Sequence, residues 1–209
     1  MSVDAFTSVT AAAVPLDAAN IDTDRVIPAR FLHKPRGPEY AGLLFHDVRF
    51  DEDGRERADF IMNQPAFRGA RIIVAADNFG CGSSREHAVW ALAAYGIRAV
   101  IAPSFGDIFF NNCFKIGVLP VVVSADTAAA LRRQLHAMPG ASITVDLETQ
   151  TVTGPDGAPI PFTVDPFRRQ GLLRGEDEIA LTLGHEAAIA AFERRHADEE
   201  PWLAIERRA

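Results

Sequence analysis

The central part of the chain alternates short apolar runs with stretches of helical periodicity. The apolar runs are rich in β-branched residues and predict three buried strands, at residues 71–76, 97–102 and 118–123. Between and after these strands the pattern predicts helices over residues 83–95, 107–115 and 125–137. Gly96 is a candidate C-cap for the first of these helices. Strands that alternate with helices through short connections indicate a parallel sheet covered by helices.

The two ends of the chain follow other patterns. Residues 20–36 (NIDTDRVIPARFLHKPR) pass from polar to apolar to basic, and Pro28 and Pro35 predict a long structured loop with one short helical turn. Beyond residue 140 we expect short strands at 143–147, 151–153 and 160–164, then helices at 167–173 and 185–195. We expect one domain over residues 1–209, with an ordered core from about 17 to 195 and a charged, frayed tail after 196.

Composition narrows the class of protein. Apolar residues make up 48% and charged residues 23% of the 209 residues, which is enough for a globular core. Lys and Arg total 21 against 28 Asp and Glu, a formal charge of −7, which argues against a nucleic-acid backbone as the main partner. The sequence shows no secretion-signal pattern, and no apolar run approaches the roughly 20 residues that span a bilayer.

The two cysteines, Cys81 and Cys113, provide neither a disulfide framework nor zinc-ligand spacing. Reduced thiols without a signal segment favour a cytoplasmic protein. Two thiols are also too few to hold a four-iron cluster by the usual ligation. We therefore expect this chain alone to bind no metal or cofactor.

The most informative segment is residues 80–87 (GCGSSREH), between a predicted buried strand and a predicted helix. Glycines there allow a sharp turn and a close approach of the backbone to a ligand. The free N–H groups and the dipole of a helix start favour an anion, and Arg85 adds a planar fork suited to a carboxylate. The alternative is structural, because Ser83 and Ser84 could be simple N-caps and Glu86 a first-turn acid.

Two further blocks accompany this motif, NIDTDRVIPARFL at residues 20–32 and IAPSFGDIFFNN at residues 101–112. With DNFGCGSSREHAVW at residues 77–90, they make the chain resemble the small subunit of isopropylmalate isomerase, also called 3-isopropylmalate dehydratase, in the aconitase superfamily. The resemblance covers roughly residues 17–195. It implies an α/β fold, the three-layer β/β/α swivelling domain of the C-terminal part of aconitase, with a mostly parallel central sheet.

The resemblance also implies roles for individual residues. Ser83 corresponds to the serine that acts as catalytic base, as an alkoxide, on the carbon next to a carboxylate. Ser84 and Arg85 correspond to residues that bind the substrate carboxylate. A serine is a weak base at neutral pH, so its ionised form needs nearby positive charge, which a helix start and an arginine offer.

The N-terminal block can be laid on the aconitase Thr-Asp-His segment without a gap. This alignment implies that Thr23 and Asp24 line the site, that Arg25 replaces the aconitase histidine, and that Arg36 is a second substrate-binding arginine. Arg36 could instead be an exposed loop cation.

The loop of residues 30–40 corresponds to the segment that senses the variable group of the substrate. An isopropyl group needs an apolar contact, for which Phe31 and Leu32 are candidates, although either could simply anchor the loop. His87 could carry a proton, or it could form a hydrogen bond within the first helical turns.

The implied reaction is dehydration of 2-isopropylmalate and rehydration to 3-isopropylmalate in leucine biosynthesis, active only in a complex. The resemblance places a 4Fe-4S cluster in a partner large subunit, where it would act as a Lewis acid. Three alternatives stay open: a related hydro-lyase acting on homoaconitate, citraconate or dimethylmalate; a non-catalytic dicarboxylate-binding module; and a thiol enzyme that uses Cys81.

Overall fold

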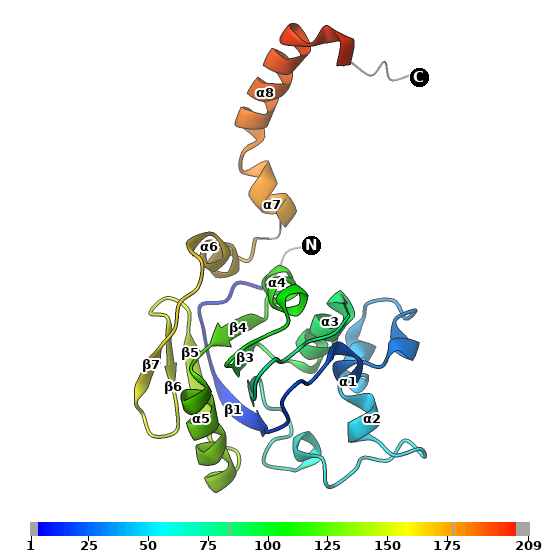
Figure 1. Ribbon diagram of the computed structural model, residues 1–209, viewed down its shortest axis with the longest axis vertical. Helices are drawn as coiled ribbons and strands as arrows, with labels where there is room; N and C mark the ends of the chain where they lie inside the picture. The colour runs from blue at the N-terminus through cyan, green and yellow to red at the C-terminus, as the bar shows by residue number, and fades with distance from the viewer. Residues whose placement is uncertain (1–3, 84, 177, 204–209) are drawn as a thin grey trace.

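Seven strands form one sheet in the order β4-β3-β2-β1-β5-β6-β7 (Figure 1). The computed structural model describes residues 4–83, 85–176 and 178–203. The strands are β1 (Ser8–Leu16), β2 (Ile72–Ala75), β3 (Ala99–Ala102), β4 (Leu119–Val122), β5 (Ser142–Asp146), β6 (Thr151–Thr153) and β7 (Pro159–Pro161). β1 pairs in parallel with β2 and antiparallel with β5, so it joins a parallel half of the sheet to an antiparallel half.

The helices follow the strands in the alternation that the sequence predicts. They are α1 (Thr23–Val26), α2 (His46–Arg49), α3 (Glu86–Tyr95), α4 (Asp107–Ile116), α5 (Ala125–Ala137), α6 (Pro166–Arg174), α7 (Glu178–Leu183) and α8 (Glu186–Glu199). Short 3-10 turns are η1 (Ala29–Phe31), η2 (Pro38–Gly42), η3 (Ile61–Asn63) and η4 (Pro201–Leu203). Gly96 ends α3 in the left-handed conformation, as predicted for a C-cap.

Two hydrophobic cores lie on opposite faces of the parallel strands. Along β2, Ile73 and Ala75 point into a core shared with α3 and α4, whereas Ile72 and Val74 point into a second core. The second core is closed by α5, by the antiparallel strands β5 and β6, and by α6. Both faces are covered, so the parallel strands are short and continuously apolar. The predicted three-layer β/β/α architecture is confirmed.

β1 is the largest element that the sequence analysis did not predict. It begins at Ser8, before the region expected to be ordered, and its alanine-rich sequence has weak strand propensity. Pairing on both sides stabilises it, because Ala13 lies opposite Ile72 of β2 and Ala11 lies opposite Ile143 of β5. Strand formation at this position therefore depends on tertiary contacts rather than on local pattern.

The C-terminal arm, formed by α7, α8 and η4, also differs from the elements that the sequence predicts. α7 was not predicted, and α8 continues four residues beyond the expected end at 195, as far as Glu199, followed by η4. The chain thus has helical elements as far as Leu203, where the described part ends. α8 buries none of its residues, and the arm projects from the body of the molecule (Figure 1). Within the described ranges, no helix combines the length and the apolar character needed to cross a bilayer.

Candidate active site

Residues 77–83 leave the carboxyl end of β2 and lie between two neighbouring loops. On one side, the N–H of Gly80 donates a hydrogen bond to the carbonyl of Ile21 at 2.7 Å. On the other side, the N–H of Phe79 donates to the carbonyl of Ser104 at 3.1 Å. The loops that follow β1 and β3 thus hold the segment at the edge of the sheet where parallel strands present their carboxyl ends, the usual position of a ligand site.

Gly80 allows the backbone of this segment to lie close to Phe109 and to Gly106. Its φ is +73°, and a Cβ at this position would lie 2.2 Å from the ring of Phe109. A Cβ on Gly106 would lie 2.5 Å from the carbonyl oxygen of Gly80. Only glycine satisfies both the backbone conformation and the contact at residue 80.

α3 begins later than the sequence analysis predicted. The helix starts at Glu86, and Arg85 is its N-cap, with extended backbone and no side-chain capping hydrogen bond. Ser83 lies in the preceding loop, because the left-handed Gly80 and Gly82 keep the chain in turns until then. The prediction that the helix starts at Ser83 is therefore wrong. Ser84 lies outside the described residues.

Arg85 connects the two segments that the sequence analysis assigned to the site. Its guanidinium forms an ion pair with the carboxylate of Asp24 on α1. The same guanidinium lies 3.4 Å from the hydroxyl oxygen of Ser83, to which it donates. The Arg85 side chain is 16% exposed, so its charge is only partly screened by water. A guanidinium has five N–H donors, which leaves donors for a carboxylate.

Thr23 fixes the backbone at the serine. Its side chain is almost fully buried, and its hydroxyl donates to the carbonyl of Ser83 at 3.1 Å. The N–H of Thr23 donates to the carbonyl of Cys81 at 2.9 Å. Asp22 caps α1 by accepting a hydrogen bond from the N–H of Arg25 at 2.7 Å. The structure therefore brings Thr23, Asp24, Ser83 and Arg85 together.

Arg36 lies in the loop between η1 and η2, where it contacts Trp90 of α3. Its guanidinium carbon is 5.5 Å from the centre of the Trp90 ring, a cation–π contact. Within the described residues it forms no ion pair, and its side chain is exposed. An anion could therefore bind it without displacing a carboxylate.

Phe31 and Leu32 are both half-buried and pack against the core on the α3 face of the sheet. The Phe31 ring also lies under the guanidinium of Arg30 at 4.5 Å and beside the ring of His46 at 4.9 Å. Both side chains therefore anchor the loop. Leu32 keeps part of its surface free for a further apolar contact.

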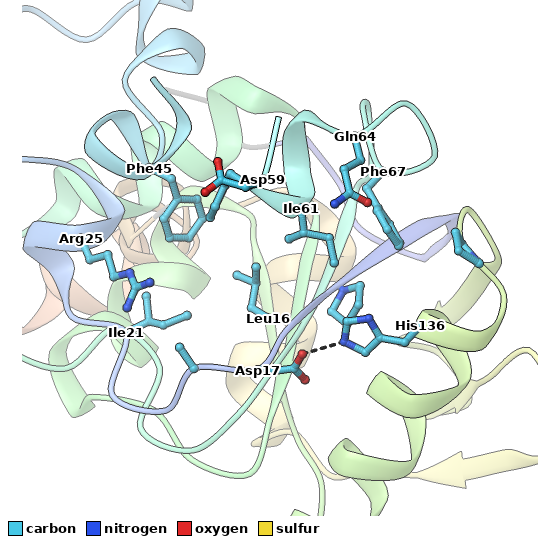
Figure 2. A pocket seen from close by; sticks show the side chains of 14 residues that line it. Leu16, Asp17, Ile21, Arg25, Phe45, Asp59, Ile61, Gln64, Phe67 and His136 are labelled. Atoms are coloured by element: carbon cyan, nitrogen blue, oxygen red, sulfur yellow. Dashed lines mark hydrogen bonds and ion pairs between the residues drawn. The ribbon is translucent and has the colours of Figure 1, made fainter. Parts of the chain in front are cut away.

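Arg25 has no described hydrogen bond or ion pair with Ser83 or Arg85. Its side chain lines a separate cavity of about 460 Å³, together with the apolar side chains of Leu16, Ile21 and Phe45 (Figure 2). Asp17 also lines this cavity and is paired with His136 and Arg132. None of Thr23, Asp24, Ser83 or Arg85 lines it. Arg25, which the resemblance aligns with the aconitase histidine, thus lines this cavity.

The two thiols and His87 differ in burial and contacts. Cys113 is fully buried, and burial raises the pKa of its thiol well above the ordinary range. Cys81 is half-buried and free. Within the described residues, no three His, Cys, Asp or Glu side chains gather as a metal site. The His87 ring lies 4.4 Å from that of Trp90, centre to centre, and forms no hydrogen bond with a described residue, so its expected hydrogen bond is not found there.

Some residues of the site escaped the sequence analysis. Asn78 adopts a left-handed backbone, and its N–H donates to the hydroxyl of Ser104 at 2.8 Å. Its side-chain amide donates to the side-chain oxygen of Asn20 at 2.8 Å. Asparagine is enriched in left-handed backbone, which is a weak local signal, but the partners of Asn78 are remote in sequence.

Comparisons with known proteins point to one family over nearly the whole chain. The family model described as Aconitase C-terminal domain matches residues 3–126, and LeuD_N matches 129–166. A model for the C-terminal domain of the 3-isopropylmalate dehydratase small subunit matches residues 178–206. A 3-isopropylmalate dehydratase small subunit of Rhodospirillum centenum is 52% identical over 96% of this chain and 98% of its own length. One from Jannaschia sp. is 50% identical over 96% of this chain and 100% of its own.

A solved structure is also similar. The crystal structure of 3-isopropylmalate dehydratase (leuD) from Methanocaldococcus jannaschii superposes with a TM-score of 0.65 and 26% identity, covering 89% of this chain and 99% of that one. Identity near half over nearly the full length, together with the shared fold, means that this chain belongs to the family of 3-isopropylmalate dehydratase small subunits.

Proposed function

We propose that this chain is the substrate-binding subunit of a 3-isopropylmalate dehydratase. The enzyme interconverts 2-isopropylmalate and 3-isopropylmalate by dehydration and rehydration, a step of leucine biosynthesis. The observation that carries the proposal is the contact of the Arg85 guanidinium with the Ser83 hydroxyl, while Asp24 holds the same guanidinium. This contact supplies the positive charge that a serine needs to act as a base.

The proposed base is Ser83. It takes the proton from the carbon next to a substrate carboxylate, and its alkoxide becomes a hydroxyl as the carbon–carbon double bond forms. In the rehydration step the same hydroxyl returns the proton to carbon. Arg85 stabilises the alkoxide through the contact at 3.4 Å, and Thr23 holds the backbone of Ser83 in place.

The proposed substrate contacts come from three segments. Arg85, with Ser84, binds one carboxylate, and Arg36 binds the other. Asp24 orients Arg85, and Thr23 lines the site beside it. Leu32 contacts the isopropyl group through its exposed part. α1, α3 and the loop around η1 all contribute to the proposed site, and we expect a surface of the partner subunit to complete it.

The proposed partner is a large subunit that carries a 4Fe-4S cluster. When bound, that cluster would act as a Lewis acid on the leaving hydroxyl. Cys81 and Cys113 are too few to ligate such a cluster, and Cys113 is fully buried. A single domain over residues 1–209 and a cytoplasmic location complete the proposal.

The test is co-expression with a candidate large subunit that carries an iron–sulfur cluster, followed by an anaerobic isomerase assay. We expect the wild-type complex to be active and this chain alone to be inactive. Ser83→Ala in the complex should reduce kcat about a thousandfold or more, by analogy with the loss of other catalytic bases. Normal turnover by the Ser83→Ala complex with its cluster intact would overturn the assignment of the base.

Substrate choice is tested in the same assay. We expect isopropylmalate to give a higher kcat/KM than homoaconitate, citraconate or dimethylmalate. A higher kcat/KM for one of these acids would assign this chain to that related hydro-lyase instead.

A further inference from the structure

The side chain of Arg36 rests on an aromatic cluster formed by Tyr40, His87 and Trp90. The guanidinium lies over the Trp90 ring at 5.5 Å, and the Tyr40 and Trp90 rings meet edge to face with centres 6.0 Å apart. The His87 ring lies 4.4 Å from Trp90 and 6.4 Å from Tyr40. These contacts join the loop that carries Arg36 to helix α3.

Tyr40 also closes that loop. Its side chain is fully buried, and its hydroxyl donates to the carbonyl of Lys34 at 2.7 Å. The N–H of Tyr40 donates to the carbonyl of Gly37 at 3.1 Å. Arg36 lies between Lys34 and Gly37, so the hydroxyl and the N–H of Tyr40 hold the chain on both sides of it. Burial raises the pKa of the Tyr40 hydroxyl, so it keeps its proton and can donate.

Trp90 lies on the same helix that Arg85 caps. The two residues are five positions apart along a rigid helix, so the backbone of Trp90 is fixed relative to that of Arg85. The indole Nε1 of Trp90 is buried and forms no hydrogen bond with a described residue. Because its backbone is fixed in α3, Trp90 can hold the Arg36 side chain that rests on its ring.

We infer that Tyr40 and Trp90 are positioning residues that fix the spacing between Arg36 and Arg85, and so match the site to the two carboxylates of one substrate. The inference rests on the proposed function, in which both arginines bind substrate. Tyr40 holds the loop backbone at Arg36, and Trp90 holds its side chain. Neither residue touches the substrate, and neither takes part in proton transfer.

The experiment uses the complex of this chain with its large subunit, in the isomerase assay. Tyr40→Phe removes only the hydroxyl and leaves the ring in place. We expect KM to rise about five- to tenfold, the change that corresponds to the loss of one hydrogen bond. Here that bond is the one from Tyr40 to the Lys34 carbonyl, which holds the loop at Arg36. We expect kcat to change by less than about twofold, because Ser83 and Arg85 keep their contacts.

The role of Trp90 is tested by two substitutions that remove progressively more of its aromatic ring. Trp90→Phe keeps an aromatic face and should raise KM about two- to threefold, whereas Trp90→Leu removes the cation–π contact and should raise it more. Equal KM values for the two variants, or a fall in kcat instead, would contradict a role for the aromatic face.

A double-mutant cycle separates positioning from general stability. If Tyr40 acts through Arg36, then Arg36→Ala should raise KM and the Tyr40→Phe, Arg36→Ala double variant should raise it no further. Additive effects would overturn the inference. If the wild-type complex showed no isomerase activity, the proposed function itself would be contradicted. An Arg36→Ala variant with a normal KM would contradict only the assignment of Arg36. The midpoint of urea unfolding of each variant shows whether the chain is folded.

Discussion

The carboxylate of Asp24 and the guanidinium of Arg85 form an ion pair, although 61 positions separate them in the chain. Asp24 lies on α1, which follows β1, and Arg85 caps α3, which follows β2. Because β1 and β2 are parallel neighbours, their carboxyl ends bring these two segments to one edge of the sheet. The pair directs the guanidinium of Arg85 toward the hydroxyl of Ser83.

Removing the charge of Asp24 is expected to impair catalysis more than folding. Asp24→Asn keeps the shape of the side chain but frees Arg85 to adopt other rotamers. We expect kcat/KM of the complex to fall about 10- to 100-fold, the usual cost of a misplaced catalytic contact. Asp53→Asn is the matched control, because it breaks the exposed pair with Arg55 at 3.0 Å, outside the site. Equal activity in both variants would show that Asp24 does not orient Arg85.

The selectivity of the loop can be tested at Leu32. Leu32→Arg places a charge where the isopropyl group is proposed to lie, while the two arginines proposed to bind carboxylates stay in place. We expect kcat/KM for isopropylmalate to fall about 10- to 100-fold, with unchanged competitive inhibition by a small dicarboxylate. Leu32→Met is the conservative control. Unchanged kinetics of Leu32→Arg would refute the assignment.

The contact between Gly80 and Phe109 predicts a loss of stability on substitution, and Gly54 provides a matched control. Gly80→Ala would combine strain at φ +73° with a clash against Phe109, and should lower the free energy of unfolding by about 3 kcal/mol. Gly54 has almost the same φ, +75°, but a Cβ added there would meet nothing within 4 Å. Gly54→Ala should therefore cost only the backbone strain, about 1 kcal/mol. Urea denaturation of both variants measures the difference, and equal losses would mean that the contact with Phe109 is relieved at no cost.

Cys113 predicts a loss of stability at alkaline pH. Burial raises the pKa of its thiol in the folded chain, whereas the unfolded chain titrates near the ordinary value of 9.0. Above that pH the unfolded state loses a proton that the folded state keeps, so the free energy of unfolding falls by up to about 1.4 kcal/mol per pH unit. Cys113→Ala should remove this contribution to the slope above the ordinary thiol pKa. An unchanged slope in the variant would contradict the burial of the thiol.

Local pattern predicted the parts of the fold whose residues act alone or with near neighbours. The apolar runs of β2, β3 and β4 and the bounds of α5 follow from the sequence, because strands buried on both faces are continuously apolar and Ser124 caps α5. The spacing of Gly80, Ser83 and Arg85 likewise indicated an anion site at this position.

Other features depend on packing between distant segments. β1 has a weak strand sequence and is a strand because β2 and β5 pair with it. Ser83 lies before α3 rather than within it, since turns at Gly80 and Gly82 delay the helix. The partners of Arg85 and Arg36 come from other elements, and contacts between distant segments leave no periodic signal in either segment. The residue types that carry the chemistry can thus be read from the chain, whereas the pairing of the parallel strands sets which of them meet.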